Sequence, residues 1–352
     1  MAMSDSSYKR RARTGFGLAA TALTLLAGCQ QSGPKQQYYL LTTSTTLPYW
    51  QTAAAGFQKA AQQYGVTATM QGPERFDPQA EVDAFRAAVA KKPAGILISV
   101  ANSSLLAPEI DAAISAGVPV ITIDSDAPES KRLYFIGTNN LAAGRLGGQR
   151  AAAQLNGKGN VVLFSITNQP NLEERLKGYK DVLASYPGIK IVDVFDTKGD
   201  SAATMQKAAD YLQRTGAGKV DGFLCLTSAA GRDVGEAIRR TGAQGRLVVA
   251  MDVDGATLQL VKEGLIDSTI SQKPYTMALL GLQALEQFHH HTPGSNSTGG
   301  SNAQGGTSAP LGGDYGLDPF APYPAFVDTG VSLVDKSNVQ TVMDQSAKVG
   351  AQ

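Results

Sequence analysis

Two short stretches of the same form decide how this sequence folds. Residues 118–128 read VPVITIDSDAP, and residues 247–255 read LVVAMDVDG. In each stretch an apolar run typical of a buried strand ends in Asp-x-Asp. A carboxylate pair in this position is used by metal sites, by phosphoryl chemistry and by sites that hydrogen-bond a ligand. Other features of the sequence are needed to distinguish among these three kinds of site.

Both stretches belong to a regular alternation of strands and helices. Strand-like runs lie at 38–44, 66–71, 94–100, 118–124, 133–137, 160–166, 190–195, 220–227, 246–252 and 267–271, with two short pieces in 325–335. Helix-length segments separate most of them; in 50–64 and 275–288 the apolar residues recur at the i, i+3, i+4, i+7 spacing of an amphipathic helix. This order predicts βαβ units, and so many parallel strands predict two doubly wound α/β lobes.

One segment departs from this pattern. Residues 289–324 are rich in Gly, Ser, Asn and Pro, a composition that cannot build a core and predicts a low-complexity insertion. All the histidines of the chain, His289–His291, fall in this range, so histidine-based catalysis is not expected.

The N-terminus has the form of an export signal. A basic cluster at 9–13 is followed by an uncharged stretch, 14–28, that is too short to span a bilayer comfortably. It ends in Leu-Ala-Gly-Cys at 26–29, which resembles the lipobox of bacterial lipoproteins. We therefore expect cleavage and lipidation at Cys29, with 30–37 as a polar tether; the alternative is a plain secretory signal with an incidental cysteine.

Composition excludes several classes of function. The chain has 352 residues, of which 43% are hydrophobic and 17% are charged, and its net charge is +1. No basic stripe suited to nucleic acid follows the first residues. The second cysteine, Cys225, lies in an apolar run and is expected in the core, so a disulfide to Cys29 is not expected.

Several strings, taken in order, carry a resemblance to a known family. They are STTLPYW (44–50), GVPVITIDSD (117–126), FIGTNNLAAGR (135–145), EERLKGY (173–179), VVAMDVDG (248–255) and STISQKPY (268–275). From about residue 38 to 335, excepting the insertion, the chain resembles the ribose- and galactose-type periplasmic sugar-binding proteins. These are the solute receptors of ABC importers and are related to the cores of lac-type repressors.

The resemblance implies the type I periplasmic binding protein fold, with two Rossmann-like lobes joined by three crossovers. The N-terminal lobe would comprise 38–138 and 273–328, including the 289–324 insertion, and the C-terminal lobe 139–272 and 329–352. The crossovers would fall near 137–139, 271–273 and 328–329.

The resemblance also assigns the strand-end aspartates. Asp124 and Asp252 match family positions that bind sugar hydroxyls from opposite lobes, and ionised carboxylates are strong acceptors for such O–H groups. Parallel strands bind ligands beyond their carboxyl ends, where both residues are expected. The alternative for each is a strand-end Asp that caps a turn or helix. For Asp126 and Asp254 that alternative is favoured.

Three further residues match the family's ligand contacts, and two more are candidates that lie at or beside the predicted crossovers. Tyr49 and Trp50 match an aromatic pair that packs on the apolar face of a sugar ring, although core packing would also explain Trp50. Arg175 matches the Arg of an Arg-x-x-Gly-aromatic string, and its planar fork can bridge two hydroxyls. Gln272 can donate and accept together, and Asn139 could serve either the ligand or the hinge.

The chain also departs from ribose-type members at polar positions. Their Arg after the first strand-end Asp is Ser125 here, and their Asn before the Pro-aromatic string is Leu47. Their Asn at the third strand end corresponds to Ser99, whose shorter side chain we still expect to contact the ligand. Another Asn of the family corresponds to Ser228 or Ala229. Because unpaired buried polar groups are costly, these changes predict a ligand other than ribose.

An enzyme reading finds little support. Asp252 and Asp254 resemble the Asp-x-Asp motif of haloacid-dehalogenase-type phosphatases, but that motif normally opens its fold and here it comes late, with Ala256 in place of Thr or Val. The sequence contains neither a phosphate-binding Gly-x-x-x-x-Gly-Lys-Ser/Thr loop nor a serine nucleophile elbow.

The sequence therefore predicts an exported, lipid-anchored solute-binding protein, not an enzyme, that captures a sugar or polyol without cofactor or metal. An ABC permease would be its membrane partner, nucleic acid is not expected to bind, and the protein would be a monomer in the periplasm or at the cell surface. The alternative on the same fold is a ligand sensor that hands its closed state to a membrane signalling partner.

Overall fold

The computed structural model describes residues 35–290 and 324–350. Cys29 and nearly all of the predicted insertion lie outside these residues, so the predictions made for them stay predictions. Among the described helices, none combines the length and the apolar character needed to cross a membrane.

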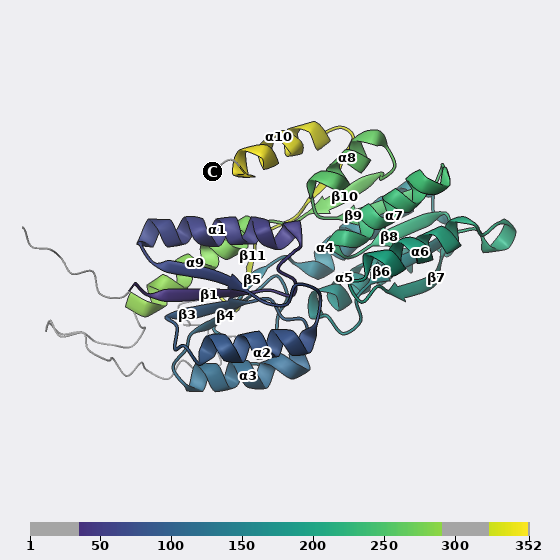
Figure 1. Cartoon of the computed structure of the whole chain (residues 1–352). Coiled ribbons are helices and arrows are strands. Elements are labelled where there is room, and N and C mark those ends of the chain that lie inside the picture. The colour runs from purple at the N-terminus through teal and green to yellow at the C-terminus, as the bar shows by residue number, and fades with distance from the viewer. Residues whose placement is uncertain (1–34, 291–323, 351–352) are drawn as a thin grey trace, which may run out of the picture. The chain divides into compact units, whose positions relative to one another are not determined.

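Within the described residues the strands form two sheets of six (Figure 1). The first sheet has the order β11 (Phe326–Asp328), β5 (Phe135–Gly137), β4 (Val120–Ile123), β3 (Gly95–Ile98), β1 (Gln37–Leu41), β2 (Thr67–Gln71). The second has the order β12 (Ser332–Asp335), β10 (Ser268–Ser271), β9 (Leu247–Met251), β8 (Gly222–Cys225), β6 (Lys158–Ser165), β7 (Gly188–Asp196). All pairings are parallel except β10 with β12.

Helices cover the sheets in layers. Those of the first sheet are α1 (Pro48–Tyr64), α2 (Pro78–Val89), α3 (Ser103–Ser115) and α9 (Pro274–His290). Figure 1 shows α1 and α9 on one face and α2 and α3 on the other. Those of the second are α4 (Asn140–Gln154), α5 (Pro170–Leu183), α6 (Ser201–Leu212), α7 (Ser228–Thr241), α8 (Gly255–Glu263) and α10 (Val339–Gly350), with a 3₁₀ turn at Gly216–Gly218.

The apolar runs explain this layering. Every residue of β3, β4 and β8 is buried, as expected for central parallel strands covered on both faces. α1 begins at Pro48, where the missing N–H costs nothing, and ends at Gly65, which takes the left-handed conformation that glycine adopts readily. The predicted α/β class with two doubly wound lobes is confirmed, and Cys225 is a buried core residue.

The chain passes between the two sheets at three places within the described residues. β5 ends at Gly137 before α4, β10 ends at Ser271 before α9, and β11 is followed directly by β12. The two sheets have matching strand orders, so β4 of the first sheet corresponds to β9 of the second. The residues that follow these two strands therefore occupy equivalent positions.

One boundary is corrected. The insertion was predicted to start at residue 289, but α9 continues through His290. His290 Nε2 lies 3.2 Å from Glu286 Oε2 one turn earlier, a contact that is an ion pair when the imidazole is protonated, and Glu286 also accepts a hydrogen bond from the Tyr38 hydroxyl. Because Glu286 is almost fully buried, it needs these partners, and they extend the helix beyond the point where the apolar pattern ends.

Candidate functional site

Asp124 and Asp252 follow β4 and β9 in the same backbone conformation. Their φ angles are 63° and 69°, in the left-handed region, which Asp tolerates better than most residues. Each backbone N–H donates to the neighbouring strand, from Asp124 to Ile136 O at 3.1 Å and from Asp252 to Ile270 O at 2.8 Å. The two carboxylates are thus presented by the same strand-end geometry, once in each lobe.

Both carboxylates line one cavity of about 650 Å³ between the lobes. Tyr49 and Trp50 line it from the first lobe. From the second lobe come Arg175 and Gln272, together with Asn171, which the sequence analysis did not single out. Five side chains along this wall form what we call the inner polar group: Asp124, Asn171, Arg175, Asp252 and Gln272.

Asp124 is surrounded by donors. It accepts hydrogen bonds from the Tyr49 hydroxyl at 2.6 Å, from Ser99 Oγ at 3.0 Å and from Asn171 Nδ2 at 3.2 Å. Burial raises the pKa of its carboxyl, while the Tyr49 hydrogen bond and the charge of Arg175 oppose that rise. Asn171 belongs to the second lobe, so its bond to Asp124 joins the two lobes.

Asp252 has fewer partners. Among the described residues its carboxylate accepts one side-chain hydrogen bond, from Gln272 Nε2 at 2.9 Å. Burial raises the pKa of Asp252 to about 7, although Arg175 and Gln272 favour the charged form. This carboxylate therefore retains capacity to accept further O–H donors.

Arg175 lines the cavity and is almost fully buried. Its guanidinium donates to the Leu226 carbonyl, to Asn140 Oδ1 at 2.6 Å and, more weakly, to Gln272 Oε1 at 3.4 Å. Its Nε has no partner among the described residues, and neither has Asn171 Oδ1. Buried polar groups without partners cost free energy.

The glycine of the Arg-Leu-Lys-Gly-Tyr string has a packing role. A side chain at Gly178 would collide with the Leu141 carbonyl at 2.3 Å, because α4 and α5 approach each other closely there. The same approach brings Asn140, at the start of α4, to the guanidinium of Arg175.

The aromatic pair lies both in the core of the first lobe and on the cavity wall. Tyr49 and Trp50 meet edge to face, with ring centroids 5.0 Å apart and planes at 88°. Both line the cavity and both belong to the apolar core of the first lobe. Trp50 is only 3% exposed, and its Nε1 donates to Thr43 Oγ1 at 3.2 Å, so its ring is held in place and only a small part of it reaches the cavity.

Two predicted contacts lie off the cavity wall. Ser99 is fully buried behind Asp124, where it donates to the carboxylate. Asn139 caps α4 by accepting from Ala142 N at 2.9 Å, and its own N–H donates to Asp328 Oδ1 at 3.2 Å. Of the two roles considered for Asn139, this position at the crossovers favours the hinge.

Asn171 and Asn140 are the residues that sequence reasoning missed. Asn171 lies one turn before Arg175 on α5, so the i, i+4 spacing places both on one helix face. The sequence alone could therefore have predicted Asn171 as a neighbour of Arg175. Asn140 reaches Arg175 only because α4 and α5 pack together, which the sequence does not display.

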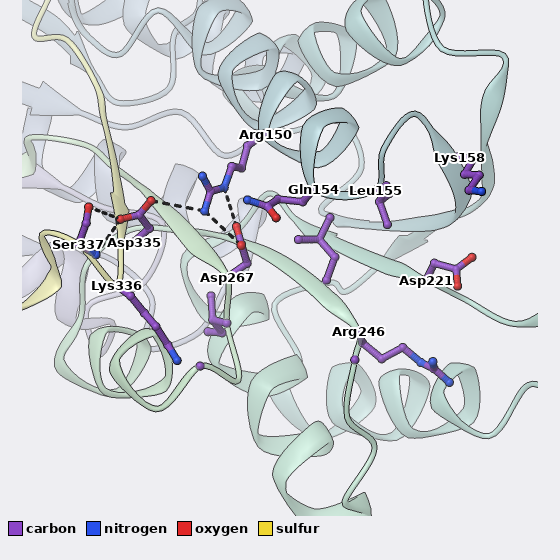
Figure 2. A pocket seen from close by; sticks show the side chains of 14 residues that line it. Arg150, Gln154, Leu155, Lys158, Asp221, Arg246, Asp267, Asp335, Lys336 and Ser337 are labelled. Atoms are coloured by element: carbon purple, nitrogen blue, oxygen red, sulfur yellow. Dashed lines mark hydrogen bonds and ion pairs between the residues drawn. The ribbon is translucent and has the colours of Figure 1, made fainter.

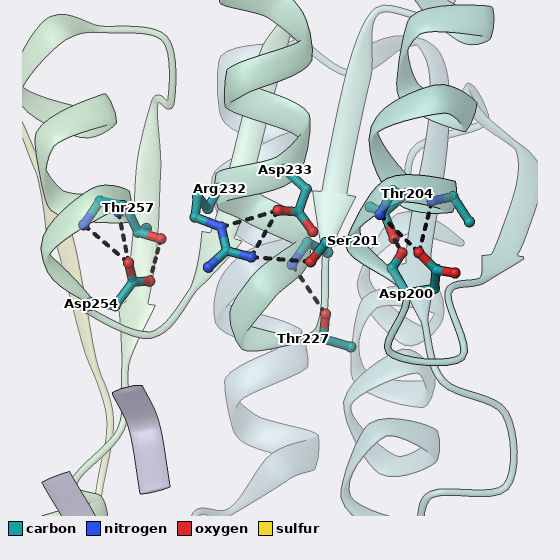
Figure 3. Close-up of polar contacts among 12 residues, drawn as sticks. Asp200, Ser201, Thr204, Thr227, Arg232, Asp233, Asp254 and Thr257 are labelled. Carbon is teal, nitrogen blue, oxygen red and sulfur yellow. Dashed lines mark hydrogen bonds and ion pairs between the residues drawn. The ribbon is translucent and has the colours of Figure 1, made fainter. Parts of the chain in front are cut away.

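The outer aspartates of the two Asp-x-Asp strings perform local tasks, as predicted. Asp126 accepts from Ala127 N at 2.8 Å and pairs with Arg132. Asp254 caps α8, accepting from Ala256 N at 3.0 Å and Thr257 N at 3.1 Å (Figure 3). Among the described residues no group of three or more His, Cys, Asp and Glu could hold a metal ion.

A larger cavity, of about 740 Å³, lies at the opposite end of the second sheet (Figure 2). It is lined by residues that begin strands, such as Lys158 of β6 and Leu247 of β9, whereas open α/β sheets bind ligands beyond the strands' carboxyl ends. Arg150 bridges Asp267 at 2.7 Å and Asp335 at 3.4 Å there, so its charge is already paired. Size alone does not make it the ligand site.

Comparison with known proteins places the chain in a family. A model of the periplasmic binding protein domain matches residues 38–288. The chain therefore belongs to the periplasmic binding protein family, of the type that includes the ribose-, xylose- and arabinose-binding proteins of ABC importers. Family membership also confirms that it is a binding protein and not an enzyme, and it implies a periplasmic or extracellular location.

Two relatives in sequence cover most of the chain. The xylose/arabinose-binding protein XylF of Sulfolobus acidocaldarius is 22% identical over 95% of this chain and 80% of its own length. The ribose import binding protein RbsB of Haemophilus influenzae is 25% identical over 75% of this chain and 90% of its own.

Solved structures agree with this placement. The arabinose-binding protein AraP of Geobacillus stearothermophilus is 31% identical with a TM-score of 0.69, covering 88% of this chain and 99% of its own. A solute-binding protein of Burkholderia graminis, solved with D-arabinose, is 26% identical with a TM-score of 0.75, covering 88% of this chain and 98% of its own.

Proposed function

We propose that this protein binds a pentose-like sugar in the cavity between its lobes and delivers it to an ABC importer. The observation that carries the proposal is the pair Asp124 and Asp252, which reach one cavity from equivalent strand ends of opposite lobes. The relatives named for ribose, xylose and arabinose support a sugar of this size.

The chemistry of the wall suits a polyhydroxy ligand. Sugar hydroxyls are donors and acceptors, and the inner polar group offers both functions. Asp252 can accept O–H bonds, while Arg175 Nε can donate to a hydroxyl or ring oxygen. Tyr49 and Trp50 offer an apolar surface to the C–H face of the ring.

The departures from ribose-type members support a ligand other than ribose. Leu47, Ser228 and Ala229 all line the cavity. The cavity wall therefore lacks polar contacts that ribose-type members have at these positions. Ser125 is buried off the wall, and its hydroxyl has no partner among the described residues.

We further propose that the lobes close around the ligand by a hinge motion. The lobes would be 38–138 with 273–328 and 139–272 with 329–352, and the crossovers would act as the hinge. The Asn171–Asp124 bond supports this, because it joins the lobes beside the cavity. A ligand that binds both lobes favours the closed state in proportion to its greater affinity for that state.

The anchoring proposal rests on the sequence. We propose that Cys29 is lipidated after removal of the signal segment, so that residues 30–37 tether a monomeric binding protein to a membrane near its permease. Mass spectrometry of the membrane fraction tests this: a diacylglyceryl group on Cys29 is expected, and release of an unmodified soluble protein would contradict it.

A sugar panel tests the binding proposal. Pentoses, hexoses and polyols are titrated while Trp50 fluorescence and the melting temperature are recorded. We expect at least one sugar to change both signals. Asp252→Asn should then weaken its binding about 10–100-fold, because hydrogen bonds to a charged group contribute about 1.5–3 kcal/mol. A panel without any response, or unchanged affinity in Asp252→Asn, would overturn the proposal.

A further inference from the structure

The ligand cavity extends beyond the inner polar group. The members of that group are connected by short hydrogen bonds, from Asn171 to Asp124 and from Gln272 to Asp252, so they surround a compact space. The cavity continues to an outer group of side chains, made up of Phe76, Asp200, Ser201 and Arg232. Its volume of about 650 Å³ lies within the range of roughly 300–1,000 Å³ found for pockets that bury drug-sized ligands, which leaves room beyond the inner polar group.

Arg232 is held in a fixed orientation at this outer end. Its Nε and Nη2 donate to Asp233 Oδ1 at 3.0 and 2.9 Å, and Nη2 also donates to Ser201 Oγ at 3.2 Å (Figure 3). The side chain of Asp233 is only 5% exposed, so this buried carboxylate needs its cation and fixes it in place. Arg232 Nη1 donates to no described residue and is available to a ligand.

Asp200 provides an acceptor beside this arginine. Its Oδ1 caps α6, accepting from Ala202 N at 2.8 Å and Ala203 N at 3.0 Å (Figure 3). Its second carboxylate oxygen receives no hydrogen bond from the described residues. Arg232 and Asp200 therefore place a donor and an acceptor at the same end of the cavity.

Phe76 reaches this end from the opposite lobe. It lies in the loop between β2 and α2, lines the cavity and packs against the apolar cluster of the second lobe that contains Ile166 and Leu172. Its ring is half-buried. An aromatic surface facing a mixed set of donors and acceptors repeats the arrangement of Tyr49 and Trp50 at the inner end.

Charge at the outer end favours a neutral ligand. Three cations in and around the cavity wall, Arg75, Lys198 and Arg232, are accompanied by three anions, Glu74, Asp200 and Asp233. An anionic group would gain nothing from this balance, whereas hydroxyls can use both signs.

Building on the sugar-binding function proposed above, we infer that the cleft accepts a disaccharide, with one unit at the inner polar group and the second between Phe76 and Arg232. The second unit would stack its C–H face on Phe76 and exchange hydrogen bonds with Arg232 Nη1 and the free oxygen of Asp200. The small side chains of Ser228 and Ala229, which line the cavity, would leave the glycosidic bond room to pass.

Calorimetric titration tests this inference with matched ligands. Each monosaccharide that binds is compared with its methyl glycoside and with its disaccharides. We expect at least one disaccharide to bind about 10-fold or more tightly than the monosaccharide, since hydrogen bonds to charged groups are stronger than those between neutral groups. The methyl glycoside should show none of this gain.

Two variants locate the gain. Arg232→Met and Phe76→Ala approach the outer end from different lobes, and each should erase the disaccharide advantage while leaving monosaccharide affinity unchanged. Because Arg232→Met strips the buried Asp233 of its cation and can destabilise the fold, Phe76→Ala provides the independent measurement. Arg145→Met removes an arginine that pairs with Asp181 outside the cavity and should change neither affinity.

The outcomes separate the two proposals. Monosaccharide binding without any disaccharide gain overturns the second subsite and leaves the sugar-binding function standing. An equal gain for the methyl glycoside, or an equal loss for both ligands in Phe76→Ala, also overturns it. Failure of every sugar to bind overturns the proposed function and this inference together.

Discussion

The two lobes present the same residue at the same strand end but surround it differently. Within the part of the chain that the structure describes, Asp124 accepts three side-chain hydrogen bonds, whereas Asp252 accepts one, from Gln272. Burial raises both pKa values, and that of Asp252 reaches about 7. The first lobe thus uses its carboxylate largely to organise its own wall and to contact Asn171, while the second lobe leaves its carboxylate open to a ligand.

Arg175 is the cation that both carboxylates share, and removing it should have the largest effect. In Arg175→Met the Leu226 carbonyl and Asn140 lose their donor, and both aspartates lose the charge that favours their ionised form. We expect the free energy of unfolding to fall by about 3–5 kcal/mol, as when one partner of a buried ion pair is lost. Urea denaturation measures this loss.

Arg175→Lys serves as the control, because it keeps the charge and loses the planar fork. It should recover part of the stability and little of the sugar affinity. Full stability in Arg175→Met would show that the carboxylates do not depend on this cation.

Neutralising each aspartate separately should distinguish the lobes. Asp252→Asn should weaken ligand binding by about 10–100-fold yet raise the melting temperature near pH 8, because it removes a buried, under-paired charge. Asp124→Asn should lower the melting temperature. The NH2 group of the new amide would face donors that the carboxylate now accepts from, so their hydrogen bonds would be lost. Differential scanning fluorimetry with and without ligand measures both effects. A melting temperature that shifts in the same direction in both variants would contradict the proposed difference between the two aspartates.

Stability should depend on pH through Asp252. Its folded-state pKa of about 7 lies above the unfolded value of 3.8, so between these values the folded protein binds more protons than the unfolded chain. The free energy of unfolding should therefore fall as pH rises from about 4 to 7. In Asp252→Asn this part of the slope should disappear, which melting curves across that range would reveal.

Ligand affinity should have the opposite pH dependence. If the sugar hydroxyls donate to the ionised form of Asp252, binding weakens as pH falls below about 7. Titrations at pH 5.5 and 8 check this, and an affinity that is level across the range would assign the hydroxyl contacts to another group.

The smallest expected effect concerns the backbone at Asp124. A residue with a Cβ pays roughly 1–2 kcal/mol in the left-handed conformation that Asp124 adopts, and glycine avoids this cost. Asp124→Gly should therefore be more stable than Asp124→Ala in the absence of ligand, although both lose the carboxylate. Chemical denaturation of the pair measures the difference, and a less stable glycine variant would contradict the strain argument.

The sequence by itself determined the layered fold and the places of the two aspartates. Apolar runs of strand length, separated by helices with a 3.6-residue period, allow few arrangements other than parallel sheets covered by helices. In such sheets the residue after a central strand faces the cleft, and Asp124 and Asp252 therefore needed no coordinates to be placed. Asp126 and Asp254 were predictable for a similar reason, because turn and cap contacts are local.

Only the tertiary structure decided how the two carboxylates differ. Whether an aspartate is ringed by donors or left open depends on side chains distant in sequence, such as Ser99 and Asn171 for Asp124 and Gln272 for Asp252. The contact of Asn140 with Arg175 and the approach of Phe76 to the second lobe likewise arise from packing between elements. These properties depend on desolvation and on hydrogen bonds between residues distant in sequence, and a local pattern of residues predicts neither.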